Sequence, residues 1–191
     1  MEDARRTQES IVGMPYGKWF EVTDGVRAQF TDAGHILGSA SVVIEAQDAG
    51  QLKRIVFSGD IGRNGLPIIR DPDPPTGGAD VILCESTYGD RDHDSVEGAR
   101  EQLGRVVRET AARGGRVLIP SFAVGRTQEL VYDLHVLYHA QQIPSIPVVI
   151  DSPLATDATS VFRMHPEIFD QSEALVREDT KIFDFELVRY T

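Results

Sequence analysis

The sequence predicts a mixed α/β protein in which two architectures follow one another. Short segments that alternate apolar and polar residues, separated by turn signals, dominate residues 20–60, a pattern typical of antiparallel hairpins. From residue 94 onward, helical and strand patterns alternate, which is typical of a parallel sheet with crossover helices. The change of pattern predicts a boundary near residues 86–94.

The first part is expected to consist mainly of strands. Residues 1–10 are polar and are predicted to form a short helix end. Turn signals at Thr23-Asp24-Gly25 and Asp48-Ala49-Gly50 separate segments of alternating polarity. Residues 64–78 are rich in Pro, Gly and Asp and are expected to be a loop. The expected strands are residues 26–30, 41–46, 53–58 and a buried strand at 80–84.

The second part is expected to alternate helices and strands. Asp94 or Ser95 can cap a helix with apolar residues at helical spacing, and Gly114-Gly115 can end it. Asp151-Ser152-Pro153 is typical of a helix start. The remaining expected elements are strands at 117–119 and 147–150 and a helix at 127–140.

Composition excludes several classes of protein. The chain has 191 residues, 41% of them hydrophobic, yet no apolar run approaches the roughly 18 residues of a membrane span. The N-terminal segment has no apolar signal region, so we expect a soluble cytoplasmic protein with no membrane partner. Cys84 is the only cysteine, which excludes an internal disulfide or a cysteine-cluster zinc site, and we expect it to be packed inside its strand. A net charge of -11 disfavours non-specific binding of nucleic acid.

Three side chains stand out as candidate metal ligands. His35 lies in a loop of small residues, and Asp60 and Glu85 each follow an expected strand. Taken singly, each has an ordinary explanation: a hydrogen-bonded histidine, an aspartate that caps a turn, a glutamate paired with an arginine. If their strands are neighbours, the three meet at one sheet edge, and imidazole with carboxylates suits zinc.

Other candidates carry weaker patterns. His135 and His139 lie one helical turn apart, but no glutamate follows His135, so we interpret them as two solvated histidines. His165 precedes a proline and is expected to end a helix. Arg126 follows Gly125 at the head of a helix, where it could bind phosphate or equally pair with Glu129.

Four segments together resemble a known family. They are DAGHILGSA (32–40), FSGDIGR (57–63), ESTYGDR (85–91) and PSFAVGRTQEL (120–130). In this order and spacing they resemble the metallo-β-lactamase-fold nucleases of the β-CASP group, and most of all the prokaryotic relatives of the polyadenylation nuclease, which process RNA. The resemblance runs from about Pro15 to Leu154.

The resemblance implies a fold and a site. Residues 1–88 would be the back part of a metallo-β-lactamase αββα sandwich, and residues 89–191 part of a β-CASP α/β domain with a parallel sheet. The family binds two zinc ions. His35 would bind one of them, Asp60 would bridge both as a metal ligand and catalytic residue, and Glu85 would position a catalytic histidine. Arg126 and Ser121 would bind substrate.

The family's main zinc signature, His-x-His-x-Asp-His, does not occur in the chain. We therefore expect an internal fragment with an incomplete zinc site, inactive alone and complemented by missing N- and C-terminal segments.

The function implied is zinc-dependent hydrolysis of RNA by the intact parent, with RNA as its partner and a homodimer left open. A non-catalytic scaffold or interaction module of the same family is one alternative. A metallo-β-lactamase-type hydrolase of a small molecule is another, although the matches at 85–91 and 120–130 argue against it.

Overall fold

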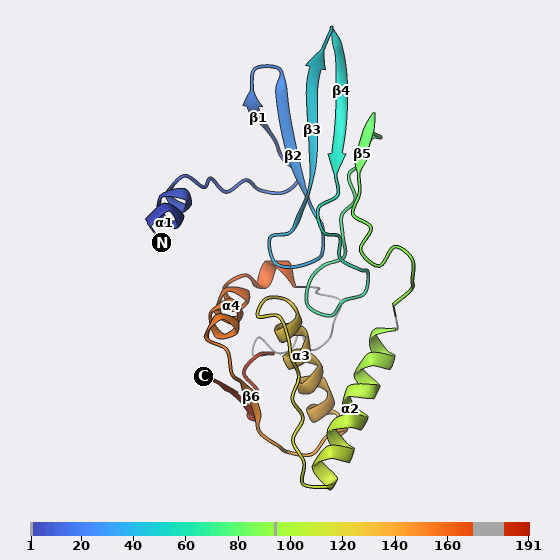
Figure 1. Cartoon of the computed structure of the whole chain (residues 1–191), viewed down its shortest axis with the longest axis vertical. Helices are drawn as coiled ribbons and strands as arrows, with labels where there is room; N and C mark the ends of the chain where they lie inside the picture. Colours follow the sequence, from blue (N-terminus) through green and yellow to red (C-terminus); the bar gives the residue numbers. More distant parts are fainter. Residues whose placement is uncertain (1, 94, 170–181) are drawn as a thin grey trace. The chain divides into compact units, whose positions relative to one another are not determined.

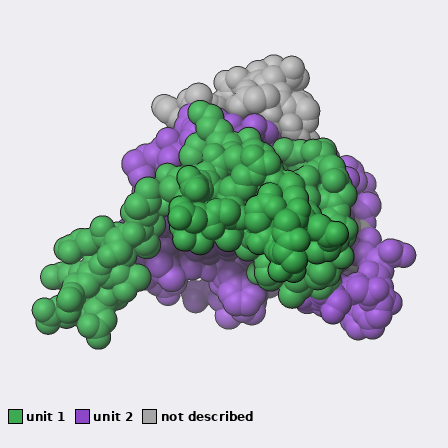
Figure 2. All heavy atoms as spheres, turned by 90° about the horizontal axis from the view of Figure 1, so that it is seen from above, with its two compact units in different colours: residues 1–33, 39–61, 73–85 green, residues 34–38, 62–72, 86–191 purple. Residues whose placement is uncertain are grey.

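The computed structural model describes residues 2–93, 95–169 and 182–191 and divides the chain into two compact units (Figures 1 and 2). The first comprises residues 1–33, 39–61 and 73–85, and the second comprises residues 34–38, 62–72 and 86–191. The predicted change of architecture near residues 86–94 therefore falls close to the start of the longest segment of the second unit. Two short segments from the first part of the chain also belong to the second unit.

The first unit is a five-stranded sheet preceded by helix α1 (Glu2–Glu9), which has no buried residue. The strands lie in chain order: β1 (Trp19–Thr23), β2 (Val26–Asp32), β3 (Ala40–Asp48), β4 (Gln51–Phe57) and β5 (Val81–Leu83). The first four pair antiparallel, and β5 pairs parallel with β4 (Figure 1). The predicted hairpins are confirmed.

The turn between β3 and β4 shows why the local sequence is sufficient to predict this hairpin. Ala49 and Gly50 both have positive φ, 48° and 79°, and Asp48 pairs with Gln51 across them. A two-residue turn with positive φ at both positions follows the twist of the two strands. This turn sets the register that pairs Val43 with Val56, two residues buried in the sheet.

A buried carboxylate joins three strands of the sheet. Glu45, only 6% exposed, accepts a hydrogen bond from Arg27 Nε at 2.7 Å and lies 3.6 Å from Arg54 Nη1. The Arg27 guanidinium also stacks over the Trp19 ring, 4.5 Å from its centroid. A register slip would leave Glu45 buried without its cations, so this cluster specifies the strand pairing.

The second unit packs helices around an apolar core. Its elements are α2 (Val96–Ala112), α3 (Arg126–His139), β6 (Val148–Ile150), α4 (Pro153–Met164), a 3-10 turn (Pro166–Ile168) and β7 (Val188–Tyr190). Tyr132, Leu137 and Phe162 are each only 1% exposed within this core. Ile68 and Ile69, from the loop 62–72, belong to the same core, which explains why that segment belongs to the second unit.

The second unit contains a strand that the sequence did not predict. β7 pairs parallel with β6, placing Val188 opposite Val148. It has only three residues, too few for their alternation of apolar and charged side chains to be distinctive, so its strand character comes from the pairing partner. The expected strand at 147–150 and helix start at Asp151-Ser152-Pro153 are confirmed by β6 and by α4, which Ser152 caps.

One strand prediction was wrong, and a second predicted strand forms but is not buried as expected. Residues 117–119 form no strand, and Leu118 is 89% exposed. The strand at 80–84 forms as β5, but its side chains are 49–65% exposed and Cys84 is exposed instead of packed. An apolar run indicates that a segment can be buried, but burial needs neighbours, and β5 is an edge strand of its sheet.

Within the described part of the chain, no helix is long and apolar enough to cross a membrane.

The N-terminus of α2 confirms the predicted cap. Ser95 has extended backbone angles, and its Oγ accepts a hydrogen bond from Gly98 N at 3.0 Å. Asp94, the alternative cap, lies outside the described residues. At the other end, Gly114 has φ of +69°, a conformation that glycine adopts without strain.

Replacing Ser95→Ala should lower the free energy of unfolding by about 1 kcal/mol, because the Gly98 N–H loses its acceptor. Urea unfolding followed by far-UV circular dichroism measures the change. Ser160→Ala is the control, since the Ser160 hydroxyl donates only to a carbonyl of its own helix. Equal effects of the two substitutions would contradict a capping role for Ser95.

Candidate functional site

Asp60 lies shortly after the end of β4 at Phe57, as the sequence predicts, and its side chain is exposed. The preceding residue, Gly59, has φ of +61°, and a Cβ atom there would lie 2.5 Å from the carbonyl oxygen of Ala40. Only glycine combines this backbone conformation with such a close approach of two chain segments. The position of Asp60 therefore depends on the contact between Gly59 and the start of β3.

Glu85 lies after β5 and is held beside the Asp60 loop. Its Oε1 accepts a hydrogen bond from Ile61 N at 2.5 Å, and its own N–H donates to Ser58 Oγ at 2.9 Å. Ser58 N donates to the carbonyl of Leu83, also at 2.9 Å. The structure thus brings together the residues that follow the parallel strands β4 and β5. The Glu85 carboxylate binds the backbone of Ile61, the residue that follows Asp60 in the chain.

Ser58 is a supporting residue that the sequence did not single out. It is 7% exposed, and its carbonyl accepts a hydrogen bond from Ser41 Oγ at 2.6 Å. Ser58 thereby joins the end of β4 to β3 on one side and to the residues after β5 on the other. The available signal was a small polar residue between an apolar strand and Gly59, too common a pattern to be specific.

His35 belongs to the second unit, whereas Asp60 and Glu85 belong to the first. Its backbone position is tightly defined within the second unit. Gly34 has φ of +62°, and a Cβ there would lie 2.6 Å from Pro72 N. A Cβ on Gly62 would overlap the carbonyl oxygen of Gly34. The predicted joint site of the three residues stays a prediction.

The donor set can be compared directly with what zinc requires. A catalytic zinc site usually has three protein ligands and a water. Within residues 2–93, 95–169 and 182–191, no three histidine, cysteine, aspartate or glutamate side chains come together in a way that could hold a metal ion. The described residues therefore do not form the zinc site that the resemblance implies.

Arg126 is the first residue of α3, after Gly125 with φ of +81°. Its Nη1 lies 2.8 Å from Glu129 Oε2, so the ion-pair alternative weighed for this residue is realised. Ser121 accepts a hydrogen bond from Thr127 Oγ1 at 3.2 Å, which ties the preceding loop to the helix. Substrate binding by Arg126 and Ser121 stays a prediction.

His135 is not the solvated residue that we expected. It is 1% exposed, and its Nδ1 lies 2.9 Å from the carbonyl oxygen of Ile182. Its ring contacts those of His139 and Phe185, with centroids 4.4 and 4.9 Å away. His135 thus packs α3 against residues 182–185, a partner about fifty residues later that helical spacing cannot reveal.

His165 caps the C-terminus of α4, as predicted. Its Nδ1 lies 2.7 Å from Glu167 Oε1, and this hydrogen bond lowers the pKa of the exposed Glu167 carboxyl. The pair therefore lies at the end of the helix, and its contacts are those of a helix terminus.

Comparison with known families identifies the class of protein. Residues 127–191 match the family model of the Beta-Casp domain. These residues therefore form part of a Beta-Casp domain, the family that the four sequence motifs had indicated.

Curated relatives extend this comparison to most of the chain. A ribonuclease of Thermus thermophilus, TTHA0252, is 35% identical over 162 residues, which are 84% of this chain and 36% of the relative. An RNase J-like protein of Methanocaldococcus jannaschii is 32% identical over 84% of this chain and 38% of its own length. Endoribonuclease YSH1 of Eremothecium gossypii is 33% identical over 86% of this chain and 21% of its own length. The chain thus spans between about a fifth and two fifths of these relatives.

Replacing Gly59→Ala should destabilise the first unit by clearly more than the roughly 1–2 kcal/mol that a left-handed backbone costs a non-glycine residue, because the new Cβ also meets Ala40. Thermal unfolding of the chain measures this.

The matched control is Gly78→Ala, in the same unit. Gly78 has φ of +72°, but a Cβ there meets no atom within 4 Å, so the control carries only the backbone cost. Equal destabilisation by the two substitutions would show that the contact with Ala40 does not hold the Asp60 loop.

Proposed function

We propose that this chain supplies two carboxylates, Asp60 and Glu85, to the RNA-cleaving site of a β-CASP ribonuclease. The observation that carries the proposal is the similarity over 84% of the chain to a protein named as a ribonuclease. The hydrogen bond between Ile61 N and Glu85 Oε1 supports it, because it joins two of the motifs on which the resemblance rests.

In this proposal, residues 1–88 are the back part of a metallo-β-lactamase core and residues 89–191 are part of a β-CASP domain. The match of residues 127–191 to the Beta-Casp domain model supports the second assignment. The five-stranded sheet with its antiparallel hairpins is compatible with one sheet of a sandwich.

The two carboxylates have different environments and so are given different roles. Asp60 is exposed and its chain position is fixed by Gly59, which suits a group that touches the reacting centre. Glu85 is half-buried and its Oε1 accepts the Ile61 N–H, which suits a residue that positions its neighbours. Carboxylates can orient an attacking water or accept its proton in phosphodiester hydrolysis.

Two carboxylates alone would repel a polyanionic substrate, so the proposed reaction also needs cations. The resemblance implies that zinc ions supply this positive charge in the intact family. The described residues offer too few ligands to hold zinc. His35 is the proposed further ligand, and the remaining ligands would come from outside this chain. The parent protein, not the isolated chain, is therefore the proposed enzyme.

In the full-length parent, Asp60→Asn should lower the rate of RNA cleavage by about 100-fold or more, since loss of one positioned charged group commonly has effects of this size. Glu85→Gln should also reduce the rate, because its amide oxygen still accepts the Ile61 N–H but the charge is lost. Cleavage of a labelled RNA under single-turnover conditions measures both rates.

Asp48→Asn is the control for this experiment. Asp48 is an exposed carboxylate at the β3–β4 turn, where it pairs with Gln51 at the start of β4, whereas Asp60 follows the end of β4. An unchanged rate in the Asp60→Asn variant would refute the proposed role.

The isolated chain should bind zinc weakly and show no nuclease activity, because two side-chain ligands do not satisfy a catalytic zinc. Equilibrium dialysis followed by atomic emission measures the zinc content. About two tightly held zinc ions per chain would refute the incomplete site.

The alternative is a non-catalytic scaffold of the β-CASP family, and the retention of His35, Asp60 and Glu85 in this chain argues against it. The two candidates predict different behaviour of the parent protein. A scaffold would not cleave RNA at all, whereas a nuclease would cleave RNA and lose that activity in the Asp60→Asn variant.

A further inference from the structure

The second unit carries a basic segment in an otherwise acidic chain. Residues 102–128 contain five arginines, no lysine and one acidic residue, Glu109, whereas the other residues hold 14 basic and 29 acidic side chains. Local charge of this kind attracts anions even where the net charge of the whole molecule is negative. The segment includes the second half of α2, which carries two of these arginines, Arg105 and Arg108.

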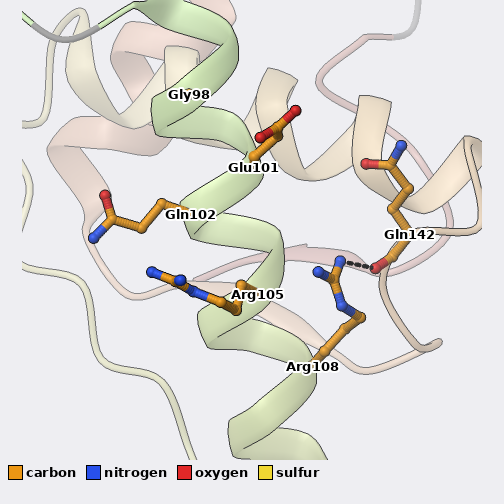
Figure 3. A pocket seen from close by; sticks show the side chains of 6 residues that line it. All are labelled: Gly98, Glu101, Gln102, Arg105, Arg108 and Gln142. Atoms are coloured by element: carbon orange, nitrogen blue, oxygen red, sulfur yellow. Dashed lines mark hydrogen bonds between the residues drawn. The ribbon is translucent and has the colours of Figure 1, made fainter.

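Two of these arginines border a hollow of about 680 Å³ on the surface of α2 (Figure 3). Its lining residues are all glycine, amide or charged: Gly98, Glu101, Gln102, Arg105, Arg108 and Gln142. Pockets for small organic ligands are usually lined mainly by apolar and aromatic side chains. The polar lining therefore indicates a hydrophilic, charged ligand instead of an apolar one.

The two guanidinium groups flank the hollow. Figure 3 shows that Arg105 extends from α2 on the side of Gln102, whereas Arg108 extends on the side of Gln142. Arg105 and Arg108 are three residues apart, so their side chains leave α2 from neighbouring positions before they extend to different sides of the helix. A linear polyanion lying across α2 could contact both guanidinium groups at once.

The Arg108 side chain is already held in place. Its Nη1 donates to the carbonyl oxygen of Gln142 at 2.7 Å, which uses one of the five N–H donors of a guanidinium. Anchoring reduces the conformational entropy lost on binding. Arginine also matches phosphate geometry well, and the amides of Gln102 and Gln142 can donate further hydrogen bonds.

We propose that the hollow formed by Gln102, Arg105, Arg108 and Gln142 binds the phosphodiester backbone of single-stranded RNA, as an accessory site sharing no residue with the proposed catalytic carboxylates. The proposal rests on the proposed function, which makes RNA the relevant polyanion. Glu101, the acidic residue in the lining, opposes the phosphate charge and tunes the affinity downward.

Binding of a fluorescently labelled oligouridylate to this chain, followed by fluorescence anisotropy with a chelator present, tests the site without cleavage. Arg105→Gln with Arg108→Gln should lower the affinity roughly tenfold or more. It should also reduce the slope of log affinity against log salt by about 1.4, since each phosphate contact on a single strand contributes about 0.7. Glu101→Gln should raise the affinity.

A charge-matched control removes two exposed arginines elsewhere, Arg5→Gln with Arg6→Gln on α1. Equal affinities of the α1 and α2 double variants, or no RNA binding by the wild-type chain at low salt, would overturn the proposal. Tighter binding of a polyglutamate peptide than of RNA would overturn it in favour of an acidic protein partner.

The outcome is separable from that of the proposed function. Affinity is measured without turnover, whereas the catalytic role depends on cleavage by the parent carrying Asp60→Asn. If the accessory site exists but the catalytic assignment is wrong, the Arg105→Gln, Arg108→Gln double variant loses affinity for RNA. The parent carrying Asp60→Asn then cleaves RNA at an unchanged rate.

Discussion

The contact between the ends of β4 and β5 is the constraint on which the candidate site depends. β4 and β5 are parallel, so no tight turn joins them. The local chain therefore does not by itself bring residues 58–61 and 83–85 together. Ser58 does so, because its N–H donates to Leu83 and its Oγ accepts from Glu85. The Glu85 carboxylate then binds Ile61 N and completes the connection.

The sequence predicted those parts of the fold whose causes are local. The Asp48-Ala49-Gly50 turn works through the backbone freedom of its own residues, and Ser95 caps α2 through a hydrogen bond to Gly98, three residues away. Such effects can be read from neighbouring positions. Asp60 and Glu85 were found for the same reason, since a carboxylate shortly after the end of a strand is a local pattern.

The wrong predictions concern features that depend on residues far apart in the sequence. The apolar residues of β5 and Leu118 resemble buried strand residues, but their burial depends on what packs against them. His135 shows the reverse case: its partner, the Ile182 carbonyl, is 47 residues away, so a histidine interpreted as solvated is instead part of the core. The sequence could not show whether Arg126 pairs with Glu129, because i,i+3 spacing permits such an ion pair without requiring it. The structure shows the pair.

Charge distribution connects the two proposals. A molecule with a net charge of -11 and two carboxylates at its candidate site repels RNA there, so productive binding needs cations from outside that site. Bound metal ions are one source, and the described residues do not hold them unaided. The arginines of α2 are another, and they belong to this chain. Because phosphate contacts position a nucleic acid without reading its sequence, arginines there would orient RNA and leave cleavage chemistry to other groups.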